Sequence, residues 1–141
     1  MGIQIRLMQA ADYAGAIHLW QGLPGLGLSS ADREEAIQAF LLRNPNTCFV
    51  AAQDDQIVGT VLGGSDGRRG YLYHLAVHAD CQKQGIGNAL VQACLDALQA
   101  QGIEKCHIFV IADNREGLKF WQNAGWNLRE DIVIMSKNIK Q

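Results

Sequence analysis

The sequence contains no block of like charges and little proline. Its 141 residues include 12 Lys and Arg, 14 Asp and Glu, and only 2 prolines. A formal net charge of −2 without clusters leaves no electrostatic footprint for nucleic acid or an anionic membrane. Because 48% of the residues are apolar, a chain of this length can bury a core, which excludes general disorder. We expect one domain over residues 1–141 and a small ligand.

Cysteine spacing and the uncharged stretches exclude further classes of protein. Cys48, Cys81, Cys94 and Cys106 stand far apart, with no Cys-x-x-Cys pair, so we expect reduced thiols and no metal site. Residues 2–8 alternate in polarity and form no apolar leader, which predicts a cytoplasmic protein. The longest run without Asp, Glu, Lys or Arg, residues 13–31, contains Pro24 and several glycines, so it cannot span a bilayer.

The hydrophobic pattern predicts an α/β fold with a mixed sheet and helices on both faces. Alternating or β-branched apolar runs predict strands at residues 2–8, 47–53, 57–63, 71–77 and 106–111, with one or two final strands in residues 126–137. Apolar residues at helical spacing predict helices at residues 12–21, 85–101 and 114–124. A further helix is expected before Asn44-Pro45, with Ser29 or Ser30 as its N-cap. The order is β-α-α-β-β-β-α-β-α-β.

Two glycines open the helix expected at residues 85–101, in the run Gln82-Lys83-Gln84-Gly85-Ile86-Gly87-Asn88. A helix N-terminus leaves backbone N–H groups unpaired and partly positive, so it binds phosphate where no Cβ blocks the approach. A dinucleotide-binding loop fits poorly because its third glycine falls at Leu90, and a Walker A loop lacks its lysine. The pattern indicates an anion seat, with a simple glycine-rich helix entry as the alternative.

Two motifs in register resemble the GNAT superfamily of N-acetyltransferases. The signature Gln/Arg-x-x-Gly-x-Gly/Ala is met by Gln82-Lys83-Gln84-Gly85-Ile86-Gly87, after a matching strand that ends in Leu75-Ala76-Val77-His78. A second block, residues 114–126, is similar to the family's Asn-x-x-Ala-x-x-Phe/Leu-Tyr-x-x-x-Gly-Phe. The resemblance covers nearly the whole chain and implies a single N-acetyltransferase domain of the GNAT-type fold. That fold has a mostly antiparallel central sheet with splayed strands.

The resemblance implies acetyl-coenzyme A as acyl donor and no metal. The strand at residues 71–77 would carry a bulge and splay from the strand at residues 106–111, leaving a cleft for pantetheine. The implied coenzyme-binding residues are Leu75, Ala76 and Val77 by their main chain, Gln82, Lys83, Gln84, Gly85, Ile86, Gly87 and Asn88 around the pyrophosphate, and Asn114, Phe120 and Trp121 on the opposite wall.

For catalysis, the resemblance directs attention to the strand at residues 71–77. The backbone N–H of Leu75 is the implied oxyanion donor, and Tyr73 or Tyr71 would relay the amine's proton to water, unless both are ordinary strand aromatics. Simple alternation places His74 on the opposite face, as a structural histidine. Trp121 stands where many members place an acidic tyrosine, so the sequence offers no general acid for the leaving thiolate at that position.

The predicted function is transfer of an acetyl group from acetyl-coenzyme A to a primary amine of a small molecule or of a peptide or protein N-terminus. The alternative is a non-catalytic acyl-coenzyme A binding module, which Trp121 and the lack of an acidic base on the 71–77 strand would suit. A thioesterase ranks third because no Asp, Glu or Ser is placed to activate water. We expect no nucleic acid or membrane partner, and the C-terminal strands would suit a homodimer edge.

Overall fold

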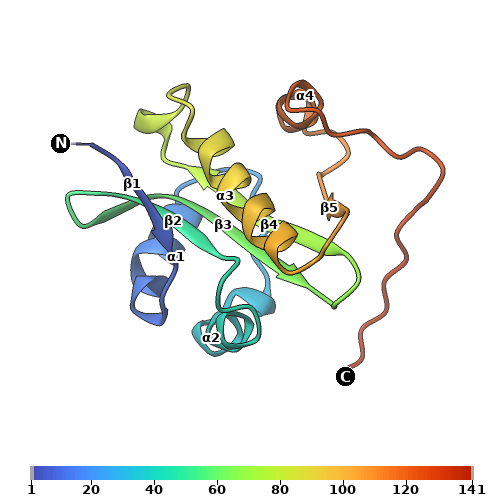
Figure 1. Ribbon diagram of the computed structural model, residues 1–141, viewed down its shortest axis with the longest axis horizontal. Helices are drawn as coiled ribbons and strands as arrows, with labels where there is room; N and C mark the ends of the chain where they lie inside the picture. Colours follow the sequence, from blue (N-terminus) through green and yellow to red (C-terminus); the bar gives the residue numbers. More distant parts are fainter. Residues whose placement is uncertain (1, 141) are drawn as a thin grey trace. The chain divides into compact units, whose positions relative to one another are not determined.

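The computed structural model describes residues 2–140, which form two units, residues 2–109 and residues 110–140 (Figure 1). The first unit contains five strands and most of the helices. Its elements are β1 (Gln4–Leu7), η1 (Ala10–Asp12), α1 (Tyr13–Gln21), η2 (Ser30–Asp32), α2 (Glu34–Arg43), β2 (Phe49–Gln53), β3 (Gln56–Ser65), β4 (Gly70–Val77), η3 (Ala79–Cys81), α3 (Ile86–Ala100) and β5 (Cys106–Ile108). The second unit contains α4 (Arg115–Asn123).

The sheet has the order β1-β2-β3-β4-β5. The first four strands are antiparallel neighbours, whereas β5 runs parallel to β4. Pairing between β4 and β5 covers only Gly70–Leu72 of β4, opposite Cys106–Ile108. Beyond Leu72, no strand of residues 2–109 pairs with this side of β4. The splay that the sequence predicted for these two strands is therefore confirmed.

A bulge interrupts β4 at His74. Tyr73 lies opposite Leu62 and Ala76 lies opposite Thr60, so His74 and Leu75 together face one residue of β3. His74 takes a φ of +50°, in the left-handed region that residues other than glycine seldom adopt. The alternation that put His74 on the face opposite Tyr73 is wrong here, because the extra residue breaks the period of two.

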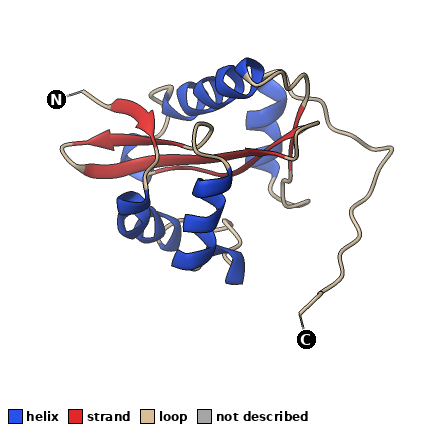
Figure 2. Cartoon of the chain, turned by 60° about the horizontal axis from the view of Figure 1, so that its bottom comes forward, coloured by secondary structure: helices blue, strands red, loops and turns tan. Residues whose placement is uncertain are grey.

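Helices cover both faces of the sheet (Figure 2). At Gly63 of β3 a Cβ would run into Cys94 of α3, and at the next residue, Gly64, it would run into Phe40 of α2. These two glycines therefore let α3 approach one face and α2 the other. On the α1 and α2 face, Trp20 is 1% exposed and packs in one cluster with Leu41 and Ala76.

Two local expectations differ from the structure of the first unit. Ser29 caps η2 rather than α2, whose N-cap residue Arg33 makes no side-chain cap. The strand expected at residues 106–111 ends at Ile108.

The cysteines are free thiols, and burial raises the pKa of Cys48 and of Cys106 to about 11. Among the described residues, no helix has the length and apolarity needed to cross a membrane.

The C-terminal unit does not contain the one or two strands expected in residues 126–137. The described chain after α4 has no regular structure, and its apolar side chains are exposed, with Val133 at 86% and Met135 at 91%. Strand propensity expresses how well a segment fits beside a partner strand, and the described residues give this segment no such partner.

Candidate active site

The N-terminus of α3 is open. Gly85 is its N-cap residue with a φ of +82°, and no side chain accepts a hydrogen bond from the first turn. The N–H of Ala89 is bonded to the carbonyl of Gly85, so the N–H groups of Ile86, Gly87 and Asn88 have no acceptor within the helix. A Cβ added at Gly85 would meet no atom within 4 Å. This helix end has the room and the polarity to receive an anion.

The loop that leads from β4 into α3 is held by its own side chains. Gln82 donates from Nε2 to the carbonyl oxygen of Val77 over 3.0 Å. The imidazole of His78 accepts the N–H of Asp80 and caps η3. Lys83 adopts a φ of +64°, which turns the chain toward Gly85. Residues 82–85 are exposed, so the loop presents a preformed surface in front of α3.

A cavity of about 350 Å³ lies beside this helix end and is lined by Gln84, Gly85, Ile86 and Ala89 together with residues of the N-terminal segment and β2. A larger cavity of about 510 Å³ lies between α1 and the turn that joins β2 to β3. The larger one contains no residue of the 82–88 loop. The anion site at residues 82–88 stays a prediction, and it rests on the free N–H groups and not on cavity size.

Aromatic side chains gather where β4 and β5 part. The ring of Tyr73 lies 6.1 Å from that of Phe40 in α2 and 6.2 Å from that of Phe109. Tyr71 lies 5.7 Å from His107 and 6.3 Å from Phe109. We call Phe40, Tyr71, Tyr73, His107 and Phe109 the aromatic wall. It gives this part of the first unit a partly exposed apolar surface, since Tyr73 is 36% and Phe109 59% exposed.

The protonation of Tyr73 follows from its surroundings. Burial raises the pKa of its phenol above the ordinary value, and the neighbouring Tyr71 raises it further. The hydroxyl is therefore protonated at neutral pH. It can donate and accept hydrogen bonds along a relay, but it is not a strong base.

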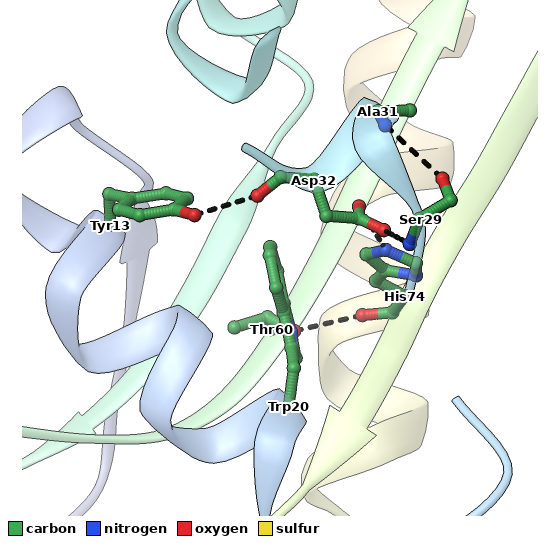
Figure 3. A network of polar contacts seen from close by, with 7 residues as sticks. All are labelled: Tyr13, Trp20, Ser29, Ala31, Asp32, Thr60 and His74. Atoms are coloured by element: carbon green, nitrogen blue, oxygen red, sulfur yellow. Dashed lines mark hydrogen bonds and ion pairs between the residues drawn. The ribbon is translucent and has the colours of Figure 1, made fainter. Parts of the chain in front are cut away.

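The contacts of His74 are ones that sequence reasoning missed. Its imidazole pairs with Asp32 of η2 and lies 4.7 Å from the ring of Trp20 of α1 (Figure 3). Both partners come from the segments that cover the face on which Tyr73 meets Phe40. Asp32 is itself buried, with 7% of the residue exposed. The local sequence pattern around each residue does not indicate that two residues 42 positions apart form a pair.

The helix of the second unit, α4, has a side-chain cap at its N-terminus. The Asn114 side chain accepts the N–H of Gly117 over 2.9 Å, so its Oδ1 is already engaged. A Cβ at Gly117 would come within 2.6 Å of Asn114 Nδ2, which explains glycine where the family motif has alanine. Trp121 stacks edge-on with Phe120 at 5.2 Å and with Trp126 at 5.0 Å. Contact of Asn114, Phe120 and Trp121 with a coenzyme stays a prediction.

Comparison with known proteins agrees with this architecture. The model of the acetyltransferase (GNAT) family matches residues 14–126. An acetyltransferase of Pectobacterium atrosepticum is 38% identical over 138 residues, 98% of this chain and 97% of its own length. An acetyltransferase of Sodalis glossinidius is 29% identical and covers 97% of this chain and 96% of its own.

Solved structures show the same fold at low identity. Ard1 of Thermoplasma volcanium superposes with a TM-score of 0.81 at 19% identity, over 92% of this chain and 85% of its own. The PaiA N-acetyltransferase of Thermoplasma acidophilum, solved in complex with coenzyme A, has a TM-score of 0.80 at 17% identity, over 94% of each chain. This chain belongs to the GNAT acetyltransferase family. The predicted α/β fold with a mixed sheet is confirmed, and the sheet of the described residues has five strands.

Proposed function

We propose that this chain, acting as one domain over residues 1–141, transfers the acetyl group of acetyl-coenzyme A to a primary amine of a small molecule or of a peptide or protein N-terminus. The observation that carries the proposal is the uncapped N-terminus of α3 next to the unpaired side of β4. One structural neighbour was solved with coenzyme A bound, and others are an aminoglycoside acetyltransferase and a ribosomal-protein-alanine N-acetyltransferase. These names support an amine acceptor.

The proposed coenzyme site follows the two open features. The proposed partners for the amides of pantetheine are main-chain groups of Leu75, Ala76 and Val77, which lie past the last residue of β4 that pairs with β5. The Val77 carbonyl accepts Gln82 Nε2 in this structure, so it would exchange that bond when pantetheine binds. The N–H groups of residues 86–88 suit the pyrophosphate, with the Lys83 ammonium on the same loop. The absence of a Cβ at Gly85 leaves room for the phosphate oxygens.

The proposed chemistry is direct attack without a covalent enzyme intermediate. The amine nitrogen forms a bond to the thioester carbonyl carbon, the carbon–sulfur bond breaks, and the thiolate leaves with its electron pair and is protonated by water. The N–H of Leu75, beside the bulge, is positioned to donate to the developing oxyanion. The attacking amine gives its proton to the hydroxyl oxygen of Tyr73 as the hydroxyl proton of Tyr73 passes to water, so Tyr73 ends in the protonation state in which it began. Trp121 supplies packing only, because an indole N–H is too weak an acid.

The aromatic wall favours acceptors with an apolar or aromatic group. None of the five side chains of the aromatic wall carries a carboxylate. A polyamine would find little to pair with there, whereas an arylalkylamine or an apolar N-terminal residue would pack against the rings.

Calorimetry and turnover test the proposal. We expect acetyl-coenzyme A to bind with release of free thiol on addition of an acceptor from a panel of phenylethylamine, spermidine and a peptide with a free N-terminal alanine. Phenylethylamine or the peptide should exceed spermidine in kcat/KM. Tight coenzyme binding without thiol release on a broad amine panel would contradict the enzyme assignment in favour of a binding module. No binding would contradict the site itself.

Tyr73→Phe tests the proton relay, because it keeps the ring against Phe40 and removes only the hydroxyl. We expect kcat to fall by about a hundredfold with coenzyme affinity unchanged, the usual worth of a positioned proton-transfer group. Tyr71→Phe is the matched control and should lose much less. Unchanged kcat and an unchanged pH–rate profile for Tyr73→Phe would assign Tyr73 to packing alone.

A further inference from the structure

A buried histidine–carboxylate pair joins β4 to the segment between α1 and α2 (Figure 3). His74 Nε2 lies 2.6 Å from Asp32 Oδ1, and the two side chains are only 15% and 8% exposed. A carboxylate oxygen only accepts hydrogen bonds, so Nε2 carries the shared hydrogen. Breaking a pair at this depth leaves a polar group without its partner, which makes the contact specific.

His74 is also held through its ring and its backbone. Its ring meets the edge of Trp20 at a centroid distance of 4.7 Å. The indole Nε1 of Trp20 donates to Thr60 Oγ1 over 2.8 Å, and Thr60 Oγ1 donates to the carbonyl of His74 over 2.8 Å. These contacts hold the bulge, whose left-handed φ at His74 is sparsely populated and persists only where the surroundings enforce it.

Asp32 anchors the other side of the pair. Its second carboxylate oxygen accepts the N–H of Ser29 over 2.9 Å, and its carbonyl accepts the hydroxyl of Tyr13 over 2.7 Å. Residues 22–33 contain one short turn, η2, as their only regular structure. Leu23 and Leu26 pack against the core, and the carboxylate of Asp32 adds a hydrogen-bonded link from this irregular segment to β4.

We propose that His74 and Asp32 are a positioning pair, which fixes residues 22–33 against the β4 bulge and so sets the affinity for the acetyl acceptor. The inference rests on the proposed function. The bulge turns His74 to the same side as Tyr73, the proposed proton relay, and the next residue is Leu75, the proposed oxyanion donor. The segment that Asp32 holds therefore lies beside the place where an amine must approach.

The pair acts on the acceptor and not on the coenzyme. When the Asp32 carboxylate is removed, the carbonyl of His74 keeps its bond from Thr60, so the bulge and the backbone of Leu75 keep their support. What is lost is the hydrogen-bonded link from residues 22–33 to β4, while the packing of Leu23 and Leu26 on the core remains. Acceptor KM and coenzyme affinity are thus expected to respond differently, which a role in folding alone does not predict.

The chain offers a matched control in η1. Asp12 has the same place in its turn as Asp32, accepts the N–H of Gln9 over 2.8 Å, and pairs with Arg6 through two contacts of 2.8 and 2.9 Å. Asp12→Ala removes a capping carboxylate and breaks its contact with the paired side chain, as Asp32→Ala does. The difference is that Arg6 lies in β1, at the other edge of the sheet from β5.

The experiment measures acceptor KM, kcat and coenzyme affinity for Asp32→Ala, His74→Leu, their double variant and Asp12→Ala. The acceptor is whichever of phenylethylamine and the alanine peptide the wild type uses better. We expect each single variant at the pair to raise acceptor KM about tenfold, the double variant to be no worse than either, and coenzyme affinity to stay within about twofold. Asp12→Ala should leave KM unchanged. His74→Gln, which restores an N–H donor, should recover most of the affinity.

Several outcomes would overturn the inference. An unchanged acceptor KM in folded Asp32→Ala, a parallel loss of coenzyme affinity, or an equal rise of KM in Asp12→Ala would each assign the pair to the fold alone. If His74→Leu does not fold, His74→Asn, whose shorter amide cannot reach the carboxylate, replaces it with the same expectations. Failure of the wild type to turn over any amine would contradict the proposed function instead.

Discussion

The N-termini of α3 and α4 are built in opposite ways. The helix α3 begins at Gly85, which has no side chain and leaves the first N–H groups without a cap. The helix α4 begins at Asn114, whose side chain accepts the N–H of Gly117. Both ends have the partial positive charge of a helix N-terminus, but only α3 leaves it available to a ligand. The comparison predicts an anion site at α3, where a glycine N-cap leaves open space in front of the free N–H groups, and none at the capped end of α4.

Gly85→Glu should produce the largest effect, because it closes the open end of α3. The carboxylate would occupy the anion's place and satisfy the free N–H groups from within the chain, as Asn114 does in α4. We expect the affinity for acetyl-coenzyme A, measured by calorimetry, to fall by about a hundredfold or more, equivalent to about 2.7 kcal/mol.

Gly85→Asn is the control for backbone strain at this position. Asparagine tolerates a left-handed φ better than other residues and adds no charge, so it should lose less affinity than glutamate. If folded Gly85→Glu binds the coenzyme as tightly as the parent, the pyrophosphate site lies elsewhere. The difference between the N-termini of α3 and α4 then does not explain coenzyme binding.

Trp121→Ala tests whether the aromatic side chains of α4 contribute to the coenzyme site. Removing the indole eliminates its edge-on contacts with Phe120 and Trp126. If Trp121 also packs on the coenzyme, affinity should fall by about tenfold through lost contact area. Trp121→Tyr should retain or improve turnover. Loss of turnover in folded Trp121→Tyr, with binding intact, would show that the indole itself takes part in the reaction.

Asn114→Ala opens the end of α4 and should lower the free energy of unfolding by about 1 kcal/mol, the usual contribution of an N-cap. Asn114→Asp retains the cap and adds a negative charge, so the thermal midpoint should hold. If Asn114 also reaches the coenzyme, only the aspartate variant will weaken binding without loss of stability. If both variants bind the coenzyme as tightly as the parent, the role of Asn114 is capping alone.

Gly117→Ala should have the smallest effect. Alanine gains about 1 kcal/mol of helix propensity, but its Cβ displaces the Asn114 amide and removes a cap of similar worth. Thermal unfolding should therefore show little change. In the Asn114→Ala background the cap is already absent, so the same substitution should stabilise by about 1 kcal/mol. A destabilising effect in both backgrounds would contradict this account of the glycine.

Much of the fold followed from local patterns. The spacing of apolar residues predicted α1, α3 and α4 within one or two residues of their observed bounds, because amphipathic periodicity depends on neighbours in the chain. Gly85 was predicted as the opening of α3 because only the backbone conformation and space at a helix start are needed to recognise it. The coincidence of two motifs then identified the family, which the comparison confirmed.

The remaining features were decided by tertiary structure. The bulge at His74 depends on how β4 registers with β3, and a pattern of alternation contains no information about an extra residue. The pair formed by His74 and Asp32 joins residues 42 positions apart, so the sequence around either residue does not predict it. Residues 126–137 have the composition of strands but form none among the described residues, because a strand is stabilised by hydrogen bonds to a neighbour that its own sequence does not supply.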